Sequence, residues 1–339
     1  MGSLIAYSGI STKIRAMERW RLSDEQFREL AAVETVPEAV QYLRRFSPYR
    51  EIFAGVEDKD LHRGNIEQHL ELSQYRDFAR LYKFADRKQR HFLELYFMHY
   101  EINVIKFCLR SAAGSGMLKQ DLSAFQEAGG RRLRFDAEKL AQSRGLEQFI
   151  LNLKGTLYYE PLSCLLREGK AGPAACETIL DMLYFKTVWK LKNRCLSAGE
   201  QKALTQCMGT RIDMLNLQWI CRAKKYYRLQ PGEICAMLIP IRLHLTKKEI
   251  QDMTEADTPE QVYTRIRDTW YGRRGLLPPA EGISIDRLAQ EINDRIYERT
   301  RQRKPYSAAV LNSYLYFKER EIGRIITVIE RIRYGVTAS

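Results

Sequence analysis

Residues 246–271 read TKKEIQDMTEADTPEQVYTRIRDTWY, and residues 23–49 read SDEQFRELAAVETVPEAVQYLRRFSPY. Both stretches begin with Ser or Thr three positions before Glu or Gln, a capping box in which the hydroxyl accepts an early helix N–H. In each, a Thr follows twelve residues later, again three positions before Glu or Gln, and the stretch closes with Ser or Thr two positions before a tyrosine. The pattern predicts two short capped helices and a corner tyrosine, repeated within one chain.

A weaker copy of the pattern lies in the middle of the chain. There Ser143 begins the stretch SRGL, thirteen residues before Thr156 in the triplet Thr156-Leu157-Tyr158. The corner tyrosines are then Tyr49, Tyr158 and Tyr271, and we expect them to be equivalent. Each ring should be buried between helices, with its hydroxyl on a backbone partner.

Each copy closes on a further amphipathic helix in which a polar residue leads an apolar stripe. These helices are expected at residues 103–107, 213–220 and 321–326. Small residues at 112–116, continuing through Gly129-Gly130, and the segment 240–246 mark the boundaries between copies. The sequence therefore predicts three helical repeat domains, at residues 1–116, 117–245 and 246–339.

Helical signals dominate the long segments as well. Residues 66–110 contain neither Pro nor Gly, and one continuous helix there would be roughly 65 Å long, unless the polar cluster at residues 87–90 interrupts it. Residues 236–245 are the one candidate strand. The predicted fold is therefore all-α.

Composition limits the classes of function. Hydrophobic residues make up 45% and charged residues 29%, and the net charge of +13 favours an acidic partner, whether protein, lipid headgroup or nucleic acid. The seven cysteines form no C-x-x-C pair, which indicates free thiols in a reducing cytosol. No apolar run approaches the ~18 residues that cross a bilayer.

Sequence patterns typical of catalytic sites are absent. Gly169-Lys170 resembles the end of a phosphate-binding loop, but Cys164 stands where that loop requires Gly and Ala171 where it requires Ser or Thr. The five histidines lack the spacings of zinc sites. We therefore predict no catalytic, cofactor-binding or metal-ligating residue, and no cofactor.

Basic clusters interleaved with aromatic residues are the candidate docking surfaces. One group comprises Arg131, Arg132 and Arg134. A second, the basic stripe of residues 222–228, comprises Arg222, Lys224, Lys225 and Arg228 with two tyrosines. Such a mixture suits nucleic acid, but the chain carries no nucleic-acid fold signature, so a partner-facing or solvated stripe is the preferred interpretation.

The order and spacing of these features resemble the family formed by the C subunits of V-type and A-type ATPases, whose member in eukaryotic V-ATPases is the d subunit. Tyr7–Met17 is similar to the family's opening helix, and the corners at Tyr158 and Tyr271 are similar to its recurrent T-x-Y. Residues 213–222, followed by Pro231-Gly232, resemble its D-x-x-N-hydrophobic element and later turn.

In two of the repeats the sequence departs from this pattern. The first repeat has Tyr100 where Asp213 stands, and Pro48 lies inside its corner. The third repeat has Glu321 where Asn216 stands.

The resemblance implies a funnel of three pseudo-threefold helical domains, seated on the cytoplasmic face of the membrane proteolipid ring. It implies that the D and F subunits of the central stalk insert into this socket, so that the chain passes torque during ion transport and ATP synthesis or hydrolysis. The expected protein is a non-enzymatic, peripheral, cytoplasmic accessory subunit that binds no nucleic acid. The alternatives are a basic helical scaffold that binds nucleic acid and a helical hydrolase with an unrecognised site.

Overall fold

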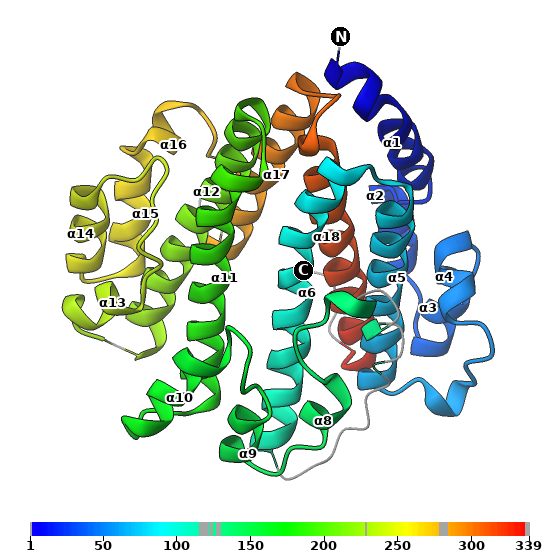
Figure 1. Ribbon diagram of the computed structural model, residues 1–339, viewed down its shortest axis with the longest axis horizontal. Helices are drawn as coiled ribbons and strands as arrows, with labels where there is room; N and C mark the ends of the chain where they lie inside the picture. Colours follow the sequence, from blue (N-terminus) through cyan, green and yellow to red (C-terminus); the bar gives the residue numbers. More distant parts are fainter. Residues whose placement is uncertain are drawn as a thin grey trace. The chain divides into compact units, whose positions relative to one another are not determined.

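The computed structural model describes residues 2–114, 122, 125–126, 130–227, 229–277 and 284–335. In that part of the chain every regular element is helical and none is a strand (Figure 1). The predicted all-α fold is confirmed.

Groups of short helices alternate with long ones along the chain. The elements up to residue 167 are α1 (Gly2–Glu18), α2 (Asp24–Ala31), α3 (Val36–Leu43), α4 (Ser47–Ile52), the 3-10 turn η1 (Asp58–Asp60), α5 (Arg63–Phe84), α6 (Arg87–Ala113), the 3-10 turn η2 (Gly130–Arg132), α8 (Ala137–Ala141), α9 (Leu146–Leu151) and α10 (Tyr159–Arg167). The later elements are α11 (Pro173–Cys195), α12 (Ala198–Arg222), the π-helical turn η3 (Ala223–Tyr227), α13 (Pro231–Met237), α14 (Lys247–Glu255), α15 (Pro259–Arg267), α16 (Trp270–Arg273), α17 (Ile285–Arg303) and α18 (Ala308–Arg333).

The chain divides into two compact units. The first contains residues 1–175 together with 313–339, and the second contains residues 176–312. These limits differ from the predicted repeat boundaries near 116 and 245, so neither unit corresponds to a single repeat. The division into three repeats stays a prediction.

Capping boxes start the short helices α2 and α14, as the sequence predicted. The Ser23 hydroxyl accepts the Gln26 N–H at 3.2 Å, and the Gln26 side chain accepts the Ser23 N–H at 2.8 Å. The Thr246 hydroxyl accepts the Glu249 N–H at 3.1 Å, and the Glu249 carboxylate accepts the Thr246 N–H at 2.7 Å. Each box satisfies N–H groups that the first helical turn leaves without a partner.

The middle copy begins differently from the sequence prediction. Ser143 does not cap a helix, because the N-cap residue of α9 is Gly145, which has φ +85° and makes no side-chain capping bond. The preceding short helix, α8, is capped instead by Asp136, whose carboxylate accepts the Lys139 N–H at 3.0 Å. The capping-box pattern misses this cap, because Asp136 stands where the box has Ser or Thr and Lys139 where it has Glu or Gln.

Residues 66–110 form two helices, α5 and α6, which pack against each other. The chain leaves α5 at Ala85 with ψ 143°, and Asp86 then caps α6 by accepting the Gln89 N–H at 2.9 Å. The predicted alternative of a break beside the polar cluster is therefore confirmed.

The prediction of a candidate strand at residues 236–245 is wrong. Its backbone is bonded by side chains of α12: the Asn216 amide accepts the Ile239 N–H at 2.9 Å and donates to the Ile239 carbonyl at 3.0 Å. Because a helix side chain satisfies these backbone groups, no neighbouring strand is required.

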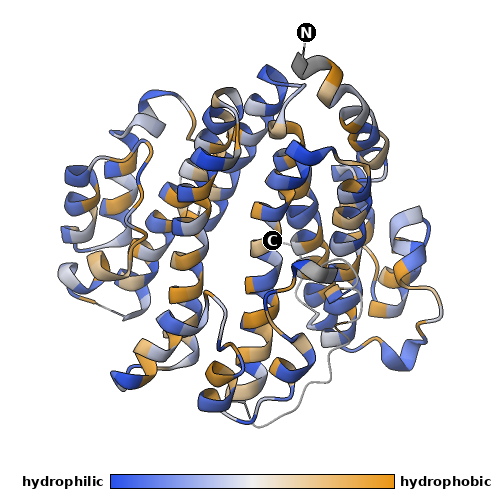
Figure 2. Ribbon diagram, viewed as in Figure 1, coloured by the Kyte–Doolittle hydropathy of each residue, from blue (hydrophilic) through white to orange (hydrophobic). Residues whose placement is uncertain are grey.

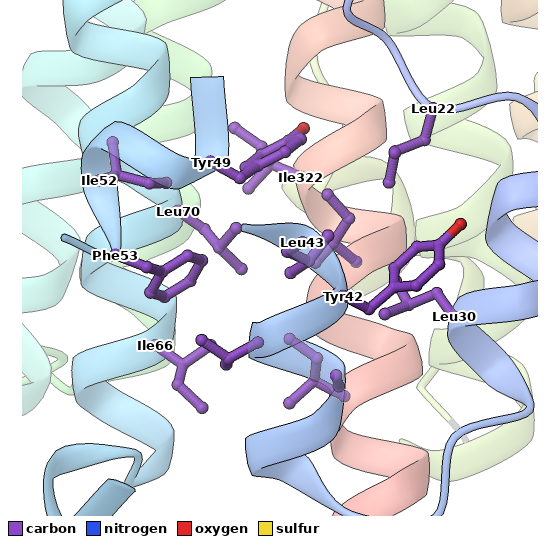
Figure 3. Packing of buried hydrophobic residues seen from close by; sticks show 14 of the residues in the cluster. Leu22, Leu30, Tyr42, Leu43, Tyr49, Ile52, Phe53, Ile66, Leu70 and Ile322 are labelled. Carbon is purple, nitrogen blue, oxygen red and sulfur yellow. The ribbon is translucent and has the colours of Figure 1, made fainter. Parts of the chain in front are cut away.

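One buried core of the first unit joins the short helices α2–α4 to α5 and α18. Figure 3 shows Leu43 of α3, Leu70 of α5 and Ile322 of α18 directed into the space between these helices. Figure 2 shows that hydrophobic and hydrophilic residues are interspersed along the helices. A fully buried Leu or Ile side chain contributes about 1.5–3 kcal/mol, so the buried isoleucines of residues 322–329 hold α2–α4 strongly.

Candidate docking surface and corner tyrosines

Tyr158 lies at the start of α10, and its side chain is fully buried. Its hydroxyl donates to Glu101 of α6 at 2.8 Å, and the other Glu101 oxygen accepts the Arg134 N–H at 3.1 Å. The Arg134 guanidinium lies 3.4 Å from the same carboxylate. Burial raises the pKa of Glu101, and Arg134 and the tyrosine hydroxyl oppose that rise.

Tyr271 in α16 is also fully buried and donates to a buried carboxylate, that of Asp213 in α12, at 2.7 Å. Asp213 also accepts the Leu243 N–H at 3.1 Å and the His244 N–H at 2.8 Å. Burial raises the pKa of Asp213, while these bonds favour the charged form. The His244 ring stacks on Trp270 at 3.5 Å between centroids and lies edge-on to the Tyr271 ring at 5.7 Å.

Tyr49 in α4 is the third buried corner tyrosine. Burial, and next the nearby Glu321 carboxylate on α18, raise its pKa well above the usual value. Lys318 donates to the Tyr49 hydroxyl at 3.3 Å and lies 3.6 Å from Glu321, which also accepts the Leu22 N–H at 2.7 Å.

The prediction that each corner hydroxyl bonds to a backbone group is wrong. The hydroxyls of Tyr158 and Tyr271 donate to carboxylates. The Tyr49 hydroxyl accepts a hydrogen bond from Lys318, which lies beside the Glu321 carboxylate. The two accepting carboxylates lie 57 and 58 residues from their tyrosines, so no local pattern in the sequence could reveal them.

The first basic group is engaged within the protein. The Arg132 guanidinium lies over the Tyr82 ring at 3.5 Å, and Arg134 pairs with Glu101. The side chain of Arg131 lies outside the described part of the structure. Arg132 and Arg134 thus make contacts within the protein.

The basic stripe of residues 222–228 is divided. Arg222 pairs with Asp286 at 2.8 Å, and the Lys224 ammonium donates to the Thr254 carbonyl at 2.6 Å, where burial lowers its pKa. Arg228 lies outside the described residues. Lys225 is exposed and lies 5.2 Å from the Tyr226 ring, and Tyr226 and Tyr227 are 65% and 71% exposed.

A largely apolar groove lies between α13 and α14 of the second unit, with a volume of about 610 Å³. Its lining includes Leu238, Ile239 and Ile250, and the exposed thiol of Cys235. Thr254, the acceptor of Lys224, also lines it, which links the groove to the basic stripe.

The groove carries charges among its lining residues. Arg242 and Lys247 precede or begin α14, and Glu255 ends it. An apolar floor with charges of both signs suits an amphipathic protein segment.

Gly169-Lys170 ends a helix. Gly169 has φ +68°, its N–H donates to the Leu166 carbonyl at 3.1 Å, and the Lys170 N–H donates to the Leu165 carbonyl at 3.0 Å. This pair of bonds is a Schellman motif, which closes the C-terminus of α10. Lys170 pairs with Glu168 at 2.9 Å.

Neither a metal site nor a membrane-spanning helix occurs among the described residues. No cluster of three or more His, Cys, Asp or Glu side chains there is arranged to hold a metal ion. No helix in the same part of the chain is long and apolar enough to cross a membrane.

Comparisons with known proteins cover almost the whole chain. Residues 10–339 match the family described as ATP synthase (C/AC39) subunit. The C subunit of the A-type ATP synthase of Thermococcus kodakarensis is 27% identical, over 97% of this chain and 87% of the relative. The corresponding C subunits are 26% identical in Pyrococcus horikoshii, over 96% and 86%, and 22% identical in Methanosphaera stadtmanae, over 97% and 84%.

Proposed function

This chain belongs to the ATP synthase (C/AC39) subunit family, and we propose that it couples the D and F subunits of the central stalk of a rotary ATPase to the membrane proteolipid ring. In this role it is a non-catalytic rotor component, peripheral to the membrane on its cytoplasmic face. Torque passes through it during ion transport, and the chemistry of ATP takes place elsewhere in the complex.

The observation that carries the proposal is the extent of the family match. It spans residues 10–339, and the aligned relatives named as C subunits of A-type ATP synthases share 84% or more of their own length with this chain. The resemblance seen in the sequence is thereby confirmed. Long helices such as α6, α12 and α18, stabilised by packing, suit a part that transmits force.

We further propose that the exposed part of the basic stripe and the adjacent groove form one docking surface for the stalk. Lys225, Tyr226 and Tyr227 supply exposed cationic and aromatic groups, and the groove between α13 and α14 supplies an apolar floor. Aromatic anchors beside an apolar pocket typically carry most of the binding free energy of an interface. Lys224 is excluded from this surface, because its ammonium is committed to Thr254.

Co-purification is the direct test of the coupling role. The full chain, carrying an affinity tag, should recover the D and F subunits and the proteolipid ring from detergent-solubilised membranes. Recovery of the tagged chain alone from membranes that contain an intact ATPase would contradict the proposal.

Thiol labelling tests the docking surface. Cys235 in the groove and Cys164 in α10 are both exposed. The side chain of Cys195 lies outside the described part of the structure, so the experiment uses a Cys195→Ser background. Adding purified D–F complex should slow maleimide labelling of Cys235 at least tenfold and leave that of Cys164 unchanged. If a stable complex forms while Cys235 labels at its original rate, the stalk docks elsewhere.

The alternative of a nucleic-acid scaffold keeps one supporting observation. Tyr226 and Tyr227 are exposed beside Lys225, and exposed aromatic rings beside cations can stack on bases. Salt-dependent retention of the chain on single-stranded DNA, lost in a Tyr226→Ala, Tyr227→Ala variant, together with no recovery of ATPase components, would favour this function.

A further inference from the structure

Two buried tyrosine–carboxylate pairs have nearly the same separation along the chain. Glu101 on α6 accepts the hydroxyl of Tyr158, which lies 57 residues later in the chain. Asp213 on α12 accepts the hydroxyl of Tyr271, which lies 58 residues later. Each pair joins a long helix to the last of the short helices that follow it. The third buried corner tyrosine, Tyr49, lies beside Glu321 on α18, which is the last long helix of the chain.

Each of these carboxylates also accepts a backbone N–H from the residues just before a capped short helix. Glu101 accepts that of Arg134, two residues before the cap Asp136, and Asp213 accepts that of His244, two residues before the cap Thr246.

Glu321 makes the corresponding bond at the beginning of the chain. It accepts the N–H of Leu22, one residue before the cap Ser23. In each case one carboxylate lies at both the beginning and the end of a group of short helices.

We infer that Glu101, Asp213 and Glu321 are three copies of one internal site, which we call the anchor. At each anchor a carboxylate on a long helix of one predicted repeat binds the short helices of the next repeat. The carboxylate of the third repeat binds the short helices of the first. The packing module is therefore built across the repeat boundary, and this inference does not depend on the proposed function.

The anchors also correct the register of the repeat alignment. The sequence pattern places Tyr100 opposite Asp213, but Glu101 is the residue that makes the same bonds. The pattern places Glu321 opposite Asn216, but it too matches Asp213. The sequence could not fix this register because Glu and Asp differ in length and the neighbouring residues differ in type.

The three anchors differ in the groups that accompany them. Arg134 pairs with Glu101, and Lys318 lies beside Glu321, where Asp77 and Tyr314 also approach. Asp213 accepts from two backbone N–H groups and from the Tyr271 hydroxyl. A buried carboxylate needs such donors, because without them its desolvation costs several kcal/mol.

The core contacts agree with a module that crosses the repeats. Short-helix residues of the first repeat share one buried cluster with residues of α18, namely Leu22, Phe27, Leu43 and Tyr49 with Ile322, Ile325 and Ile329. The Arg324 guanidinium lies over the Phe27 ring at 3.9 Å and also donates to Asp24, 300 residues away along the chain. The short helices of the first repeat therefore rest on the last helix of the third.

Hydrogen–deuterium exchange of the isolated full chain tests the anchor. Each carboxylate is changed to its amide, as Glu101→Gln, Asp213→Asn and Glu321→Gln. Exchange should rise at least tenfold in the short helices of the following repeat, namely α8–α10 for Glu101, α14–α16 for Asp213 and α2–α4 for Glu321. The short helices of the other two repeats should keep their protection.

A matched control exists on α6. Glu94 accepts the Tyr82 hydroxyl at 2.8 Å, but both residues belong to the first repeat, and Glu94 is 43% exposed. The substitution Glu94→Gln should leave the exchange of α8–α10 unchanged. Should an amide variant fold poorly, Tyr158→Phe and Tyr271→Phe remove the same bond while keeping the ring, and should produce the same pattern.

Two results would overturn the inference. One is exchange that rises only within the repeat that carries the substituted carboxylate. The other is a rise spread evenly over all three groups of short helices.

Discussion

At the residue scale, the buried tyrosine Tyr158 concentrates several interactions in one side chain. Its ring packs edge-on against Phe135 at 6.3 Å, and its hydroxyl satisfies a buried carboxylate. Loss of the ring opens a cavity, and loss of the hydroxyl leaves Glu101 short of a donor.

Truncation of this residue should therefore be costly. We expect Tyr158→Ala to lower the free energy of unfolding by about 3 kcal/mol or more, by cavity formation, and Tyr158→Phe by about 1–3 kcal/mol, by the lost hydrogen bond. Urea unfolding followed by circular dichroism measures both. Equal stability of Tyr158→Phe and the unsubstituted protein would mean that the bond to Glu101 has no net value.

Glu71 on α5 should make stability depend on pH. Burial, and next the charge of Glu67, raise its pKa from the ordinary 4.5 to about 7. Between these values the folded protein holds a proton on Glu71 that the unfolded chain releases, so the contribution of Glu71 to stability is greatest below about pH 4.5 and is lost as pH rises through about 7. The total loss amounts to about 3 kcal/mol.

The substitution Glu71→Gln should remove the Glu71 contribution to this slope and stabilise the protein at pH 8. Thermal unfolding between pH 5 and pH 8 measures the effect, and Glu25→Gln, at an exposed site on α2, serves as the control with an unchanged slope. A Glu71→Gln variant with the original slope would place the titration at another group.

At the element scale, the short helix α16 depends on a close approach of backbone. A Cβ added at Gly272 would lie 1.9 Å from the Arg267 carbonyl oxygen, whereas one added at Gly323 in α18 would meet no atom within 4 Å. Gly272→Ala should therefore destabilise the protein by about 2–3 kcal/mol through overpacking, and Gly323→Ala should stabilise it by about 0.5–1 kcal/mol. Melting temperatures of the two variants should move in opposite directions.

The capping box that begins α14 should also have a measurable value. Thr246→Ala removes the hydroxyl that accepts the Glu249 N–H, and we expect a loss of about 1 kcal/mol. Thr264→Ala, at an exposed position inside α15, is the control and should be neutral or slightly stabilising, because Ala has the higher helix propensity. Chemical denaturation separates these outcomes; a Thr246→Ala variant as stable as the control would show that the cap is dispensable.

At the scale of the whole molecule, the net charge of +13 should act on the rate of association with an acidic partner. We expect Lys225→Glu to slow association with the D–F stalk about 3–10-fold at low salt, and the difference to shrink as salt screens it. Stopped-flow or surface-binding kinetics at several salt concentrations measures this. Lys88→Glu on α6, an equal charge change at another exposed position, should have a much smaller effect; equal effects would show that only net charge matters.

The sequence by itself determined the helical class, the short capped helices and the family. Capping boxes at Ser23 and Thr246 act within four residues, so these elements are readable from local spacing. Family membership was readable because the order of such local signals extends over the whole chain.

Only the tertiary structure decided which groups meet. The sequence marked Asp213 and Glu321 as polar residues that lead an apolar stripe, and it did not mark Glu101 at all. The tyrosines that meet these carboxylates lie far along the chain. Folding likewise leaves the Lys225 side chain exposed, whereas its neighbour Lys224 donates to the Thr254 carbonyl. Local spacing fixes a helix because its hydrogen bonds join near neighbours, whereas burial and pairing depend on which distant surfaces exclude water together.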